Sequence, residues 1–136
     1  MSSGFHITNY IPKKLLRTSL YKRLYSLYRD FQAKYVLLEA KRQLISLHKI
    51  DNPLFIVVIP GSLHLVEICL RFVPQNISTI LINNGLSDWE SDFSRKHLNR
   101  AGIINIPRMI EHGQVIDFLL AGLDQPFTIL DYDCFV

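Results

Sequence analysis

Two aspartates, Asp131 and Asp133, stand two positions apart directly after an apolar run. In an extended strand the side chains at i and i+2 project to the same side, so both carboxylates would share one edge. Paired carboxylates are hard oxygen ligands that suit Mg²⁺ or Mn²⁺, and such a cation could bridge to phosphate oxygens. The spacing therefore predicts a divalent-metal site that helps a diphosphate leave. The residues also leave open a plainer alternative, in which two solvated aspartates cap the next turn.

The chain before this pair alternates between apolar runs and helical patterns. We predict strands over residues 54–59, 77–82, 103–106 and 127–130, and helices over residues 62–73, 89–100 and 113–123. The runs are rich in β-branched residues, and Pro or Gly residues separate them from the helices. Such alternation indicates parallel pairing with right-handed crossovers. We therefore predict an α/β fold, a Rossmann-like three-layer arrangement with a mostly parallel sheet.

Polar residues gather at the predicted carboxyl ends of these strands. In parallel sheets, ligands bind beyond those ends, near the point where the strand order reverses. Besides the aspartates, the polar or turn-forming residues at these ends are Pro60, Gly61, Ser62, Asn83 and Asn84. The pattern thus predicts where a site lies, and it does not identify the substrate.

A basic segment precedes the strands, and its apolar residues recur at three- and four-residue steps. They are Leu16, Leu20, Leu24, Leu27, Phe31, Tyr35 and Leu38. This spacing predicts a long basic amphipathic helix over residues 12–50. Residues 1–50 carry ten basic and two acidic side chains, a net charge of +8, whereas residues 51–136 carry a net charge of −5. Because Pro53 ends any helix, we divide the chain into a helical segment, 1–50, and a βα half-domain, 51–136.

Two roles remain open for the basic helix. It can lie on an anionic membrane surface or on a partner protein, with its tyrosines at the interface. Alternatively, it is an ordinary surface helix that packs its Leu/Tyr stripe on the domain and leaves its lysines in solvent, which is the interpretation we favour. No nucleic-acid recognition motif accompanies the basic residues, so nucleic acid is not an expected partner.

The composition places the chain among soluble globular proteins. Its longest apolar run, residues 54–59, is far shorter than the roughly 20 residues that span a bilayer. The first residues lack the apolar core of a secretory signal. We expect a cytoplasmic protein and leave peripheral attachment to a membrane open.

The ordered motifs over residues 52–136 resemble the nucleotide-binding half of GT-A-fold glycosyltransferases, especially those similar to family 2. The matching pieces, in chain order, are Phe55–Pro60, Ile82–Asp88, His112-Gly113 and Phe127–Asp133. The resemblance implies a nucleoside-diphosphate sugar of UDP or GDP type as the ligand, with Mn²⁺ or Mg²⁺ as the cofactor. Family members usually carry a carboxylate where Asn83 stands, which puts recognition of the base in doubt.

The resemblance also implies a role for each site residue. Pro60, Gly61 and Ser62 would lie beside the base or ribose, and Asn83 or Asn84 would contact the base. His112 would face the sugar or the diphosphate. Asp131 and Asp133 would contact the ribose and the metal-bound diphosphate.

Glycosyltransferases of this kind also need an acceptor-binding half with a catalytic base, and we find no convincing base between residues 54 and 130. We therefore expect the N-terminal half of such an enzyme, inactive by itself, with its catalytic residues unassigned. One alternative is a non-catalytic module or remnant whose basic helix docks to a membrane or partner protein. Another is a fragment of a haloacid-dehalogenase-like phosphatase, in which the first aspartate is the nucleophile and the second the acid/base. The phosphatase is disfavoured because its motif normally closes the first strand.

Overall fold

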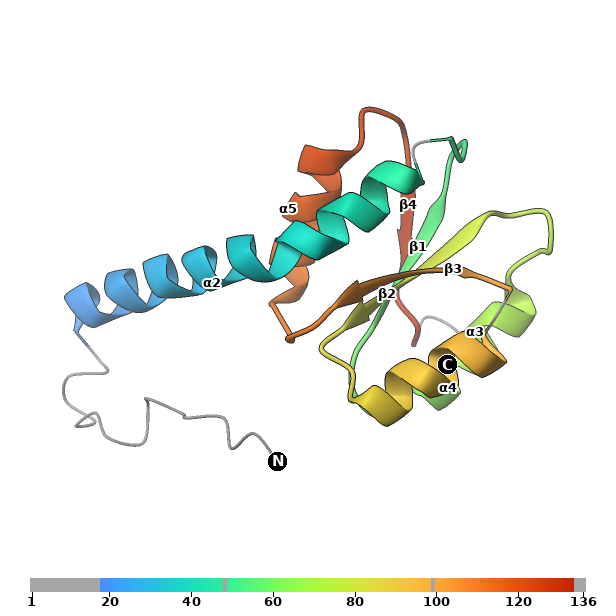
Figure 1. The fold of residues 1–136 in the computed structure, drawn as a ribbon, viewed down its shortest axis with the longest axis horizontal. Helices are drawn as coiled ribbons and strands as arrows, with labels where there is room; N and C mark the ends of the chain where they lie inside the picture. Colours follow the sequence, from blue (N-terminus) through green and yellow to red (C-terminus); the bar gives the residue numbers. More distant parts are fainter. Residues whose placement is uncertain (1–17, 48, 99, 134–136) are drawn as a thin grey trace. The chain divides into compact units, whose positions relative to one another are not determined.

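The strands of this protein lie side by side and parallel, as Figure 1 shows in the computed structural model. The structure describes residues 18–47, 49–98 and 100–133. Its elements are α2 (Ser19–Ser46), β1 (Leu54–Val58), α3 (Leu63–Phe72), β2 (Thr79–Asn84), α4 (Asp88–His97), β3 (Gly102–Ile106), α5 (His112–Gly122) and β4 (Thr128–Leu130). In these residues the strands form one sheet in the order β3-β2-β1-β4. The predicted α/β fold with a parallel sheet is confirmed.

Alternate residues of the strands face two separate cores. On one face, Phe55 and Val57 pack with α5 and with residues 35–46 of α2. On the other face, Ile56 and Val58 pack with α3 and with the end of α4. The continuous apolar run of β1 thus reflects a strand buried on both faces, and the layers are helix, sheet and helix (Figure 1).

The second strand lies two residues later than predicted. It runs over Thr79–Asn84, so Asn83 and Asn84 are strand residues and not turn residues. Asparagine is rare inside strands, and sequence patterns therefore favour an earlier end. Here Asn83 pairs in register with Val58 of β1 and Asn105 of β3, which extends the strand to the edge of the sheet.

The basic helix forms, but from Tyr35 onward its predicted packing is wrong. Within the described residues, the side chains of Leu20, Leu24, Leu27, Phe31, Tyr35 and Leu38 are all more than half exposed. The residues of α2 that enter the core are instead Ala40 and Leu44, both fully buried. These two residues lie on the side of the helix that packs in the core, whereas the larger residues of the stripe lie elsewhere on the helix. Pro12 and Leu16, where the helix was predicted to start, lie outside the described residues.

The chain divides into two compact units, Met1–Lys34 and Tyr35–Val136. In the second unit, Gln43 of α2 accepts a hydrogen bond from the backbone N–H of Asn105 at 2.8 Å, which satisfies a donor of strand β3 at the edge of the sheet. The functional division at residues 50 and 51 stays a prediction. No helix in the part of the chain that the structure describes is long and apolar enough to cross a membrane.

Gly85 follows β2 and permits a close backbone contact. Its φ angle is +73°, and a Cβ atom there would lie 2.6 Å from Cα of Met109 and closer still to its nitrogen. The Gly85 N–H donates to the carbonyl of Ile106 at 2.9 Å. The loop between β3 and α5 therefore packs directly on the end of β2.

We predict that Gly85→Ala lowers the free energy of unfolding by about 2–4 kcal/mol, because it combines left-handed strain with overlap of the Met109 backbone. Gly61→Ala is the matched variant, since Gly61 has φ +83° but open space at its Cβ position, and about 1–2 kcal/mol is expected. Gly113→Ala in α5 should be neutral or stabilising by up to about 1 kcal/mol. Urea denaturation measures all three. Equal losses for Gly85→Ala and Gly61→Ala would contradict the close contact.

Candidate functional site

The order of the sheet reverses beside β1. The chain proceeds outward from β1 to β2 and β3, and then returns to place β4 on the other side of β1. Ligands of such sheets bind in the crevice beyond the carboxyl ends of the strands at the reversal. Pro60 and Gly61 follow β1, and Asp131 follows β4. These predicted site residues therefore flank the reversal point.

In the turn after β1, the serine is buried and the two residues before it are exposed. Pro60 and Gly61 are exposed, whereas Ser62 is buried. The Ser62 hydroxyl donates to the carbonyl of Ile59 at 2.7 Å and accepts from the Ile59 N–H at 3.1 Å. The serine therefore closes the turn on itself, and the two preceding residues stay exposed.

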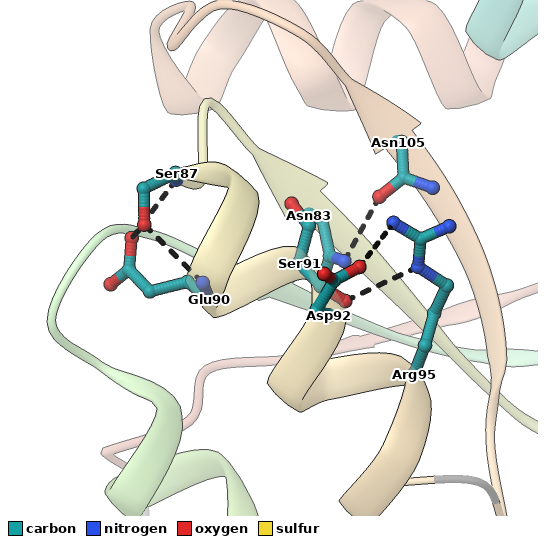
Figure 2. A network of polar contacts seen from close by, with 7 residues as sticks. All are labelled: Asn83, Ser87, Glu90, Ser91, Asp92, Arg95 and Asn105. Atoms are coloured by element: carbon teal, nitrogen blue, oxygen red, sulfur yellow. Dashed lines mark hydrogen bonds and ion pairs between the residues drawn. The ribbon is translucent and has the colours of Figure 1, made fainter.

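Glu90, which the sequence-based prediction missed, joins this turn to the start of α4. Its carboxylate accepts from the backbone N–H of Gly61 at 2.7 Å and from the hydroxyl of Ser87 at 2.8 Å. Figure 2 shows the bonds between Ser87 and Glu90, which form a capping box. The Gly61 bond, followed by the Ser87 backbone bond, lowers the pKa of Glu90. The Ser-x-x-Glu spacing signals the cap, but the bond to Gly61, 29 positions away, is a tertiary contact.

The two predicted asparagines are both buried and hydrogen-bonded. Asn83 donates to the side chain of Asn105 at 3.0 Å (Figure 2). It also accepts from the hydroxyl of Ser94 at 3.4 Å. Asn84 makes a paired contact with the backbone of Ile110, accepting from its N–H and donating to its carbonyl, both at 2.9 Å. Either side chain would have to exchange these bonds to contact a base, so that role stays a prediction.

His112 and Asp131 come together from different elements. His112 begins α5, and its Nε2 atom lies 3.9 Å from Oδ1 of Asp131. Both side chains are at least half exposed. The structure thus brings together two residues that the sequence separates by 19 positions, at the edge where the site was predicted. An imidazole beside a carboxylate can offer a donor and an acceptor to one ligand.

The geometry assumed for the aspartate pair is not the one observed. Strand β4 ends at Leu130, and Tyr132 and Asp133 lie in a turn. The alternation of an extended strand therefore does not carry through Asp131 and Asp133. Tyr132 is partly buried against the core on the α3 side, whereas both aspartates are exposed.

These aspartates fit only part of a metal site. Among the residues that the structure describes, no group of three His, Cys, Asp or Glu side chains is placed to hold a metal ion. Mg²⁺ is commonly held by one or two carboxylates together with substrate phosphates and water. Asp131 and Asp133 would supply two carboxylates to a cation that a diphosphate also binds.

A hollow of about 540 Å³ lies at the opposite edge of the sheet, between the last turns of α3 and α4. Arg100 lines it and donates to the carbonyls of Leu70 at 2.7 Å and Val73 at 2.5 Å. These bonds satisfy carbonyls at the end of α3 that the helix leaves unpaired. We therefore assign Arg100 a capping role at the end of α3.

Residues 32–136 match the model of the StrH glycosyltransferase N-terminal domain family. The chain belongs to this family. The StrH-type match includes the second half of α2 and every strand of the sheet, so it covers the whole candidate site. It confirms the predicted relation to glycosyltransferases, while the GT-A class and the likeness to family 2 stay predictions.

A curated relative agrees with this StrH-type assignment. The chain is 30% identical over 84 residues to the dTDP-dihydrostreptose--streptidine-6-phosphate dihydrostreptosyltransferase of Streptomyces griseus. The match covers 62% of this chain and 22% of the relative, so the StrH-type chain spans about a fifth of that protein's length. No solved structure matches the chain significantly.

We predict that Glu90→Gln lowers the melting temperature most at neutral pH and progressively less on acidification. The folded pKa of Glu90 lies below 4.5, so its stabilising effect is present above pH 4.5 and is lost as the pH falls through the folded pKa. Melting curves of both proteins across this range measure the effect. Glu67→Gln, which breaks an exposed pair with Arg71, should change stability little at neutral pH. A difference between wild type and Glu90→Gln that does not vary with pH would contradict the assignment.

Proposed function

We propose that this domain binds the nucleoside-diphosphate part of a sugar donor at the carboxyl edge of its sheet. The observation that carries the proposal is the meeting of His112 and Asp131, 3.9 Å apart, beside the reversal between β1 and β4. Membership of a glycosyltransferase domain family supports it. The curated relative is named for a dTDP-sugar donor, so dTDP is the first ligand to test, ahead of the UDP and GDP types that the sequence suggested.

In this proposal the exposed residues contact the donor. The backbone of Pro60 and Gly61 lies beside the base or ribose, because this turn is exposed next to the reversal point. His112 donates to an oxygen of the diphosphate or the sugar, and Asp131 accepts from a ribose hydroxyl or binds a cation.

The buried residues shape the site instead of touching the ligand. Ser62 closes the turn after β1, and Asn84 holds the loop that leads to His112. Asn83 and Ser94 fix the end of β2 against α4. Glu90 is a positioning residue, because its carboxylate holds the backbone of Gly61.

The proposed cofactor is Mn²⁺ or Mg²⁺, held jointly by Asp131, Asp133 and the diphosphate. A divalent cation in that position would neutralise charge on the departing diphosphate. Because the described residues provide no third protein ligand there, metal affinity should depend on the nucleotide.

The proposal covers binding of the donor and leaves out the acceptor. The curated relative is named for transfer to streptidine 6-phosphate, and this chain spans about a fifth of it. We propose that the isolated chain binds a nucleotide without transferring a sugar, and that transfer requires an acceptor-binding half.

We predict that dTDP with Mn²⁺ raises the melting temperature of the chain, and that Asp131→Asn removes the rise. A ligand that binds only the folded state adds about 2.7 kcal/mol at 100 times its dissociation constant. Thermal shifts with dTDP, UDP, GDP and CDP, each with and without metal, measure this. Mn²⁺ alone should have little effect.

Asp124→Asn is the matched control, because Asp124 is an exposed aspartate in the turn before β4. It should keep the nucleotide-dependent rise. Absence of a rise with all four nucleotides would contradict donor binding by this domain. An equal rise in Asp131→Asn would retain nucleotide binding and remove Asp131 from it. A rise that needs no metal would remove the cation.

A further inference from the structure

Helix α2 carries a stripe of large apolar side chains that are exposed to solvent. The α2 stripe consists of Leu20, Leu24, Leu27, Phe31, Tyr35 and Leu38, whose side chains are between 57% and 76% exposed. Steps of three and four residues align these side chains along one side of the helix. Ile45 continues the line one heptad after Leu38 and is also more than half exposed. Large apolar residues gathered in this way mark an interaction surface.

The stripe is separate from the side of α2 that packs on the sheet. Ala40 and Leu44 are fully buried in the core, together with partly buried Val36 and Leu37. At about 100° per residue, Leu44 lies about half a turn around the helix from Tyr35. From Tyr35 onward, α2 is therefore apolar on two opposite sides, and packing against the sheet explains only one of them.

The net positive charge of α2 favours an anionic binding partner for the stripe. Residues 18–46 contain six basic and two acidic residues, a net charge of +4. Lys34 and Lys41 continue the seven-residue spacing of Leu20 and Leu27, so they border the stripe along the same line. In a parallel, in-register pair of identical helices joined through the stripe, each of these lysines would face its own copy, and such contacts between like charges are destabilising.

The other side chains of the helix suit a lipid surface. Leucine and phenylalanine fit the boundary between head groups and acyl chains, and tyrosines such as Tyr28 and Tyr35 fit the head-group region, where an apolar ring meets a polar hydroxyl. The bordering lysines would lie at the level of the lipid phosphates. We propose that α2 docks on the surface of an anionic lipid bilayer, with the helix parallel to it and the α2 stripe in the interface. This goes beyond the proposed donor binding and does not depend on it.

Co-sedimentation of the full chain with vesicles tests the proposal. We expect binding to vesicles of phosphatidylcholine mixed equally with phosphatidylglycerol, and little binding to phosphatidylcholine alone. The double variant Leu24→Gln/Phe31→Gln should bind at least about tenfold more weakly, because it removes two of the apolar contacts with the bilayer. Glutamine is a good helix former, so the helix itself should be kept. Replacing Lys34 and Lys41 with Gln should weaken binding by about fivefold for each charge, and high salt should remove that difference.

Leu120→Gln is the matched control, because Leu120 is an equally exposed leucine on α5 at 62%. It should bind vesicles like the wild type. Circular dichroism and melting curves should show that all variants keep the fold, since every replaced side chain is exposed. The nucleotide-dependent rise in melting temperature should be the same in Leu24→Gln/Phe31→Gln, which separates this test from that of donor binding.

Three outcomes would overturn the proposal. The first is no sedimentation with anionic vesicles, and the second is equal binding by wild type and Leu24→Gln/Phe31→Gln. The third is a dimer that forms without lipid in analytical ultracentrifugation and is absent in the same double variant. That result would assign the stripe to contact with a second copy of the chain.

Discussion

Gly85 has no room for a side chain, because a Cβ atom would overlap the backbone of Met109. This contact presses the loop between β3 and α5 against the end of β2. Asn84 secures the same loop through its paired bonds with Ile110. The loop in turn sets where α5 begins, and with it the position of His112 beside Asp131. The candidate site therefore depends on one close approach between two strand ends.

Polar groups at this edge of the sheet serve two different purposes. Buried polar atoms are costly unless they are hydrogen-bonded, and Ser62, Asn83 and Asn84 meet that condition with partners inside the chain. Exposed groups such as His112 and Asp131 carry no such constraint. Burial thus separates the residues that hold this edge of the sheet together from the exposed residues to which we assign ligand contacts.

Helix α2 shows how one pattern can serve two surfaces. Its apolar residues are numerous enough to cover both a core-facing side and an exposed stripe. The periodicity that predicts the helix is carried by the larger side chains, which form the exposed stripe. The side that packs on the sheet is marked by Ala40, whose small size gives little signal in a hydrophobicity pattern, so the sequence predicted the helix and misassigned its buried side.

The sequence by itself determined the α/β class and the order of the elements along the chain. Local signals carry this information: the buried run of β1, the Ser87 cap and the breaks at Pro and Gly act within a few residues. Only the tertiary structure decided that Asn83 and Asn84 are buried, that Glu90 holds Gly61, and that the strand ends before Asp131. Each of these depends on a partner more than 10 positions away or on where pairing with β1 stops. Such contacts form when the sheet assembles, and no local spacing records them.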